Sequence, residues 1–186
     1  YTQGAESFFG IWPLTCFHKQ HSSESRLEVA VKPINLKVVE QGQAAYEAVE
    51  SYAKKRYQEI HCARPARVNP ILLVAYRDTA VVGCLGISPA ESGPLLAETY
   101  LDVPITEFLG TLGLERVRRH ELVEVGSLAA ENGRVALSLL TQAPHFLQDG
   151  YSYAILTATR LVRRLIRCAG IVTRELALAH KQSLPS

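Results

Sequence analysis

The sequence has no long apolar run, no large excess of one charge and few cysteines, and each shortage narrows the possible functions. No stretch approaches the roughly 18–20 apolar residues that a helix needs to span a bilayer. Residues 1–17 have no basic lead followed by a clean apolar stretch, so we expect no signal peptide in this segment. The net charge of +2 argues against nucleic acid as the main partner, because phosphate binding requires a concentrated basic surface.

The cysteines are scattered along the chain. They are Cys16, Cys62, Cys84 and Cys168. They form no C-x-x-C pair, which argues against a structural zinc site and against a small-protein disulfide framework. Cys84 and Cys168 stand in apolar surroundings and are interpreted as buried free thiols, which favours a reducing compartment and hence the cytoplasm. His18 and His21 lie in a polar stretch, where histidines are usually exposed. We therefore expect no bound metal.

What the sequence does contain is enough apolar material for one α/β domain. Hydrophobic residues make up 47% and charged residues 20% of the chain, an ordinary globular composition. We interpret residues 1–25 as an N-terminal extension or loop and residues 26–186 as the domain. The periodicity predicts strands at 27–31, 71–76, 80–87, 120–128, 153–158 and 171–178. It predicts helices at 43–61, around 105–114, from Asn132-Gly133 onwards and at 159–169.

The order of these elements combines an antiparallel front with βαβ units at the back. This order resembles the GNAT-like N-acyltransferase fold, which is of class α/β (α+β) and has a mixed central sheet flanked by helices. In that fold a strand leads through a turn into a helix whose N-terminus holds the cofactor pyrophosphate, because free N–H groups and the helix dipole attract anions. The resemblance predicts that strands 121–128 and 152–158 are neighbours that part at their carboxyl ends.

Three short motifs occur along the chain. Residues 97–105 read Ala-Glu-Thr-Tyr-Leu-Asp-Val-Pro-Ile, residues 124–129 read Glu-Val-Gly-Ser-Leu-Ala, and residues 154–159 read Ala-Ile-Leu-Thr-Ala-Thr. They resemble the corresponding motifs of the thermostable hemolysin family, and the similarity runs from about residue 44 to about residue 184. More distantly, the chain is similar to acyl-homoserine lactone synthases, which take acyl groups from acyl carrier protein. Glu124 matches the glutamate of their Glu-x-Ser-Arg-Phe motif, whereas Ser127 replaces its arginine.

The resemblance implies a thioester donor, either acyl-coenzyme A or an acyl-phosphopantetheine carried by acyl carrier protein. The residues that it places at the donor site are Ser127, Leu128, Asn132, Gly133 and Arg134. The usual acetyltransferase loop, Gln/Arg-x-x-Gly-x-Gly/Ala, is only partly present, since Gly133 matches but Ala130 and Val135 occupy its first and last positions. The choice between the two donors therefore stays open. For residues 132–134 a plain turn, which Asn-Gly favours, is the alternative to phosphate binding.

Acyl transfer from a thioester also needs a base for the attacking amine. Glu124 is the candidate catalytic base, because a carboxylate between Val123 and Val125 is costly unless it is paired or hydrated. Burial would raise its pKa towards a useful range. The alternative is a solvent-facing strand residue.

The candidate substrate-binding residues lie on either side of this strand. Glu98, Tyr100 and Asp102 alternate, so an extended chain would put them on one face, lining an acceptor site or forming the solvated edge of a loop. Thr157 is implied by the resemblance of its motif. Further along, an arginine face on the helix at 159–169 could dock an acidic carrier protein or simply be solvated. Its members are Arg160, Arg163, Arg164 and Arg167.

Two functions of different classes follow. The first is an acyltransferase that moves an acyl group from a thioester donor to an acceptor, which we expect to be an amine. The second, which the family name implies, is a membrane-active hemolysin-like protein or a non-catalytic ligand-binding protein. We favour the enzyme, with lysis arising indirectly through its product.

Overall fold

The computed structural model describes residues 7–14, 33–62 and 69–179, and the structural statements below refer to these residues. Within them, seven strands form one sheet in the order β2-β3-β4-β5-β6-β1-β7. The strands are β1 (Ser7–Pro13), β2 (Asn35–Glu40), β3 (Ile71–Arg77), β4 (Ala80–Pro89), β5 (Leu122–Ala130), β6 (Tyr153–Thr159) and β7 (Arg174–Ala179). The predicted strand at 27–31, the two histidines and Cys16 lie outside the described residues.

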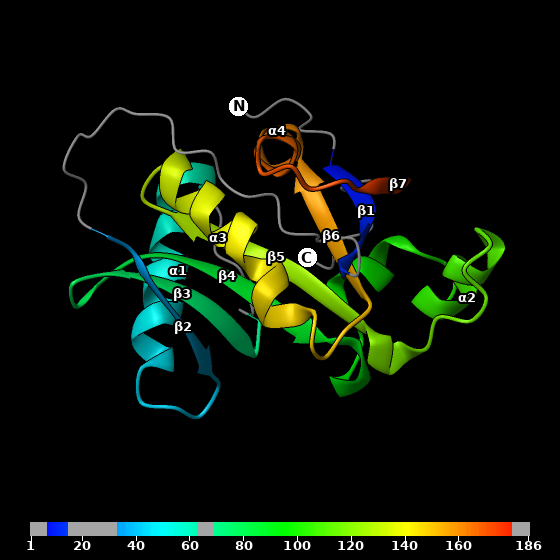
Figure 1. Cartoon of the computed structure of the whole chain (residues 1–186), viewed down its shortest axis with the longest axis horizontal. Coiled ribbons are helices and arrows are strands. Elements are labelled where there is room, and N and C mark those ends of the chain that lie inside the picture. The colour runs from blue at the N-terminus through cyan, green and yellow to red at the C-terminus, as the bar shows by residue number, and fades with distance from the viewer. Residues whose placement is uncertain (1–6, 15–32, 63–68, 180–186) are drawn as a thin grey trace.

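The remaining elements cover both faces of the sheet (Figure 1). The helices are α1 (Tyr46–His61), α2 (Ile105–Thr111), α3 (Gly133–Leu147) and α4 (Arg160–Cys168), and the 3-10 helices are η2 (Ala90–Ser92), η3 (Leu96–Tyr100) and η4 (Arg119–Glu121). On one face, α3 and α4 bury an apolar cluster that includes Leu139 and Ile166. On the other face, α1 buries Val49 and Ala53 against β3 and β4. The rest of that face, over β5, β6 and β1, packs against a cluster that includes residues of η3 and α2.

The apolar spacing explains how α3 packs. Val135, Leu139, Ala143 and Leu147 recur every four residues and are all buried, as one face of a helix requires. On β4 the helix meets Gly83, where a Cβ would lie 2.7 Å from Val135 Cγ1, so the close approach depends on glycine. Pro144 lies in the last turn of α3, which ends three residues later at Leu147.

The centre of the sheet contains its one parallel pair among the described strands, β5 and β6. Their pairing runs from Leu122–Tyr153 to Val125–Leu156 and stops there, although β5 continues to Ala130 and β6 to Thr159. Figure 1 shows the two ribbons diverging beyond this point. The prediction that these strands are neighbours that part at their carboxyl ends is confirmed. We call the place where they separate the fork.

Two expectations from the sequence are wrong. Residues 7–13 do not belong to an extension or loop, because they form β1, which is paired with β6 on one side and β7 on the other. Cys168 is exposed, whereas Cys84 is buried as expected. Burial raises the pKa of the Cys84 thiol to about 12, so this cysteine is inert.

Candidate functional site

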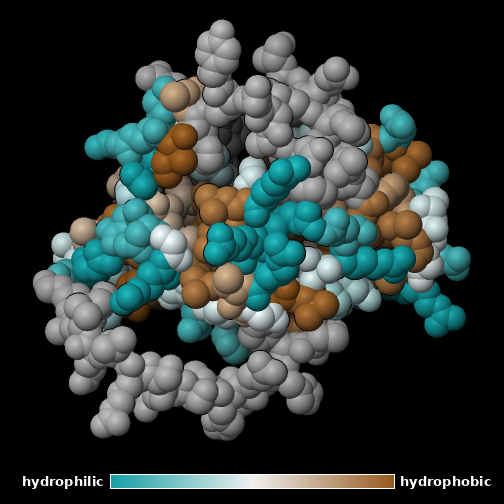
Figure 2. All heavy atoms as spheres, turned by 90° about the horizontal axis from the view of Figure 1, so that it is seen from above, coloured by the Kyte–Doolittle hydropathy of each residue, from teal (hydrophilic) through white to brown (hydrophobic). Residues whose placement is uncertain are grey.

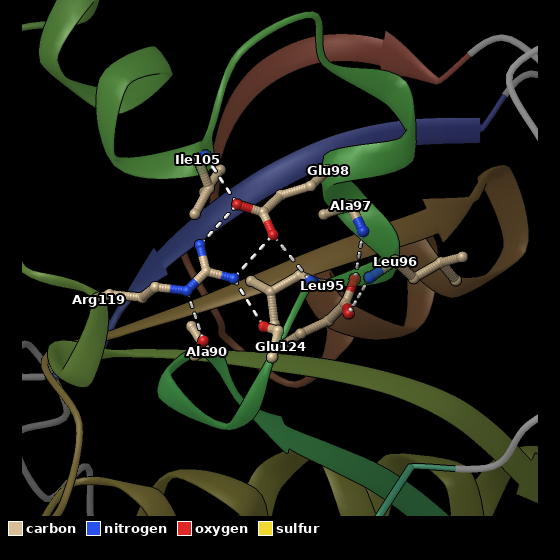
Figure 3. A network of polar contacts seen from close by, with 9 residues as sticks. Ala90, Leu95, Leu96, Ala97, Glu98, Ile105, Arg119 and Glu124 are labelled. Atoms are coloured by element: carbon tan, nitrogen blue, oxygen red, sulfur yellow. Dashed lines mark hydrogen bonds and ion pairs between the residues drawn. The ribbon is translucent and has the colours of Figure 1, made fainter.

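Glu124 is the third residue of β5 and lies on the face that carries η3. It is the only buried charged side chain among the described residues, with 4% of its surface exposed. Its two carboxylate oxygens accept hydrogen bonds from the backbone N–H groups of Leu96 and Ala97, at 2.8 Å each (Figure 3). Burial raises the pKa of Glu124, the two N–H groups lower it, and the negative charge of Glu98 raises it further. The solvent-facing alternative is therefore excluded, and the carboxylate also holds the first turn of η3.

A polar group that the sequence analysis missed lies beside Glu124. Ser88 of β4 is directly opposite Glu124 in the antiparallel register, and its hydroxyl accepts a hydrogen bond of 2.9 Å from the side-chain amide of Asn69. Asn69 rests over two facing glycines, Gly86 and Gly126. A Cβ at position 86 would lie 2.0 Å from Asn69 Oδ1, so the amide fits only because the strand lacks a side chain there. Glycines inside strands are a sequence signal for such a close approach.

Glu98 and Arg119 form a part-buried ion pair on the same side of the sheet. Arg119 donates to both carboxylate oxygens of Glu98, at 2.6 and 2.8 Å, and to the carbonyls of Ala90 and Gly93 (Figure 3). Glu98 also accepts the backbone N–H groups of Leu95 and Ile105. The hydrogen bonds from Arg119 hold the pKa of Glu98 down at about 2. Through these hydrogen bonds, Glu98 stabilises the segment that contains η3 and α2.

The expected shared face of Glu98, Tyr100 and Asp102 does not exist. Leu96–Tyr100 is a 3-10 helix rather than an extended strand, so alternate residues do not point the same way. Asp102 is exposed. Tyr100 is half-buried, and its pKa is raised first by burial and then by the charge of Glu124, which places its hydroxyl within electrostatic reach of that carboxylate.

Three predicted residues meet at the fork. Ser127 and Leu128 lie on β5 just after the last β5–β6 pair, and Thr157 is the first residue of β6 beyond it. The register of β5 against β4 shifts at this point, and Ser127 has a φ of 44°, in the left-handed region that costs a non-glycine residue energy. The bulge redirects the backbone of β5 where β6 no longer pairs with it. Backbone groups that face the fork are therefore available to a ligand.

The N-terminus of α3 is capped by a side chain of the protein itself. Asn132 is the N-cap, and its side-chain oxygen accepts the backbone N–H groups of Arg134 and Val135, both at 3.0 Å. Asn132, Gly133 and Arg134 are exposed. A pyrophosphate at this position would have to displace the Asn132 oxygen from two of the N–H groups that an anion needs. The phosphate role of these three residues remains a prediction.

The arginines of α4 are arranged partly as expected. Arg160, Arg164 and Arg167 are exposed, and Arg163 makes an ion pair with Glu175 of β7. Figure 2 views the molecule from above, the side on which α4 lies, and shows hydrophilic side chains gathered near the centre of this face. Leu161 of the same helix is 66% exposed, whereas Ile166 is buried in the core.

The described part of the chain contains no group of three or more His, Cys, Asp and Glu side chains placed to hold a metal ion. None of its helices combines the length and the apolar character that crossing a membrane requires.

The mixed sheet, its covering helices and the parted parallel pair define the GNAT-like acyltransferase fold. Two solved structures share it at low identity. The crystal structure of TofI in an apo form has a TM-score of 0.51 and 15% identity over 72% of this chain and 76% of that one. The AHL synthase LasI has a TM-score of 0.51 and 16% identity over 83% of this chain and 95% of that one. At these identities the similarity concerns the fold.

Within this fold the chain belongs to the thermostable hemolysin family, whose profile matches residues 39–186. A search of curated proteins finds no match.

Proposed function

We propose that this protein is an acyltransferase that takes an acyl group from a thioester donor and passes it to an amine. The observation that carries the proposal is the fork, where a bulged β5 separates from β6 next to a buried carboxylate. An extended pantetheine arm has amide groups that can pair with unpaired strand edges, as an added strand would. The arm is common to acyl-coenzyme A and to acyl carrier protein, and both remain candidate donors.

The reaction needs a deprotonated amine and a polarised carbonyl. The amine nitrogen attacks the thioester carbon, the new C–N bond forms, and the C–S bond then breaks to release the thiolate. Glu124 accepts the proton that the amine loses, and this proton neutralises the leaving thiolate, so that an amide and a thiol are the products. The raised pKa of Glu124 suits this role, because a base works best when its pKa is near the working pH. Ser88, Asn69 and Tyr100 are the nearby polar groups that could orient the acceptor.

The hydrogen bonds of Glu124 give it a second role, which the test must separate from the first. In Glu124→Gln, the amide can accept only one of the two N–H groups, and its own N–H₂ then faces the other. We expect the free energy of unfolding to fall by roughly 1–3 kcal/mol, the cost of an unsatisfied buried group. If Glu124 is the base, turnover measured well below the melting temperature should fall by roughly 10²–10⁴.

The matched control is Glu98→Gln, which loosens the same η3 segment and leaves the base in place. A far larger loss of turnover in Glu124→Gln than in Glu98→Gln supports the base. Equal losses would reduce Glu124 to a positioning residue. The donor is identified by thermal-shift measurements with acyl-coenzyme A and with acylated carrier protein, since a ligand that binds only the folded state raises the melting temperature. Absence of a shift with both classes would contradict the proposed function.

A further inference from the structure

One polar atom near the fork has no hydrogen-bond partner. The hydroxyl of Thr157 is buried, and it makes no hydrogen bond to any of the residues that the structure describes. The other such side-chain atom is Nε of Arg56, whose guanidinium is otherwise engaged with Glu59 and with the carbonyl of Ala130. Buried hydroxyls are nearly always paired, because an unpaired one loses its bonds to water without compensation. An unpaired hydroxyl therefore calls for a partner that is not part of the chain.

The position of Thr157 indicates what that partner is. Thr157 directly follows Leu156, the last residue of β6 that pairs with β5. Its side chain points to the same face as Ile155, which is the register partner of Glu124, because alternate residues of a strand share a face. The position next to Thr157 on β5 would be that of Gly126, which has no side chain to fill the space. A narrow chain inserted between the separating strands would lie next to Thr157 and beyond the last β5–β6 pair, so no such pair would have to break.

We infer that the Thr157 hydroxyl donates a hydrogen bond to the thioester carbonyl of the acyl donor. This inference rests on the proposed function. Two residues of a strand span roughly 6–7 Å, so Thr157 lies about one repeat further along the fork than the level of Glu124. A base at Glu124 and a hydrogen-bond donor at Thr157 can then act on opposite sides of one reacting carbon. The hydroxyl would stabilise the carbonyl oxygen as it gains negative charge.

The test compares Thr157→Val with Thr157→Ser, using C2, C8 and C16 acyl-pantetheines as probes. Valine keeps the shape of threonine and removes only the unpaired hydroxyl, so the unliganded variant should melt at the wild-type temperature or above it. Its affinity for the probe that binds wild type best should fall about tenfold, and any turnover by roughly 10²–10³, as for other lost donors to a developing oxyanion. Thr157→Ser keeps the hydroxyl and should bind like wild type.

Thr141→Val is the control, because the Thr141 hydroxyl is already paired with the carbonyls of Leu137 and Ser138 in α3. It should leave probe binding unchanged. If Thr157→Val melts several degrees lower and binds the probe as wild type does, the hydroxyl is structural and the inference is wrong. Equal binding by wild type and Thr157→Val, at any melting temperature, overturns the inference alone. Absence of binding of every probe to wild type overturns the inference, and the proposed function falls with it only if acyl-coenzyme A and acylated carrier protein also fail to bind.

Discussion

At the scale of single residues, the two glutamates around η3 titrate in opposite directions. Glu98 is held ionised by Arg119, with a pKa of about 2, whereas burial raises the pKa of Glu124. The two carboxylates belong to one connected network (Figure 3). Environments that push two pKa values apart are typical of acid–base chemistry, in which one group stays charged and the other exchanges a proton. In the reaction that we propose, Glu124 is the exchanging group and Glu98 is the fixed one.

Glu98 should make the protein sensitive to acid. Its folded pKa lies below the unfolded value of 4.5, so its stabilisation is complete above pH 4.5 and is lost as the pH falls towards 2. Glu98→Gln should therefore lower the free energy of unfolding at pH 7 by at most about 3 kcal/mol and by much less at pH 3. Thermal unfolding of wild type and of Glu98→Gln between pH 3 and 7 measures this difference. The raised pKa of Glu124 makes stability depend on pH in the opposite direction, but this contribution is the same in both proteins.

The control for this measurement is Glu91→Gln, on the exposed surface of η2. Its melting temperatures should follow those of wild type across the pH range. Parallel curves for wild type and Glu98→Gln would show that the ion pair with Arg119 contributes no pH-dependent stability.

The environment of Glu124 could be predicted from the sequence better than that of Glu98. Glu124 stands out because a charged residue between two valines of a strand requires an explanation. The partner of Glu98 is Arg119, 21 positions along the chain, and no local pattern connects them. The extended interpretation of residues 98–102 failed because Glu98 accepts the Leu95 N–H and so stabilises a 3-10 turn. A side chain that bonds to nearby backbone competes with the strand conformation.

At the scale of elements, the contact between β4, β5 and the segment before β3 depends on glycine. Gly86→Ala would place a Cβ 2.0 Å from Asn69 Oδ1, so the Asn69 side chain must move and its hydrogen bond to Ser88 must break. We expect the free energy of unfolding to fall by roughly 1–3 kcal/mol, the usual cost of overpacking. Thermal or urea unfolding gives the value.

Gly150→Ala is the matched control, because nothing lies within 4 Å of a Cβ at that position and its φ is not in the left-handed region. It should be neutral or slightly stabilising. In the double variant Gly86→Ala/Asn69→Ala the contacts with Asn69 Oδ1 and Cγ are gone, and only the 2.8 Å contact with the Cβ of residue 69 remains. The loss of stability in the double variant should therefore be smaller than the sum of the two single losses. Strict additivity would contradict a direct contact.

Some parts of the fork could be predicted from the sequence and others could not. The apolar runs predicted β5 and β6 and their adjacency, because a strand–helix–strand order favours a parallel pair. The bulge at Ser127 was not predictable, since a serine with a φ of 44° is held there by the strands around it and not by its own preference. The N-cap by Asn132 follows a local preference, although phosphate binding and a plain turn were the two roles predicted for that residue.

At the scale of the whole molecule, most of the order along the chain was predicted. The exceptions are β2, since no strand was predicted at 35–40, and β1. β1 pairs with β6 and β7, whose paired residues lie at least 140 positions away, so its role depends on contacts that no local pattern reports. The segment is short and mixed in composition, which made a loop the natural interpretation. In the structure it lies between β6 and β7 in the sheet, and its side chains Phe9, Ile11 and Trp12 are buried.

This placement predicts that the first 14 residues are required for folding. A chain that begins at residue 15 loses four large buried side chains, those of Phe9, Ile11, Trp12 and Leu14, each worth roughly 2–5 kcal/mol, against a total stability of about 5–15 kcal/mol for a typical domain. It also leaves β6 with an open edge and β7 without its partner. We expect no cooperative thermal transition by circular dichroism.

Phe9→Ala is a milder change to the same strand. It should lower the free energy of unfolding by roughly 3–5 kcal/mol while keeping a cooperative transition. In that variant Trp12, the single tryptophan and 97% buried, reports unfolding through its fluorescence. A truncated chain that melts sharply within a few degrees of the full chain would contradict the position of β1 in the sheet.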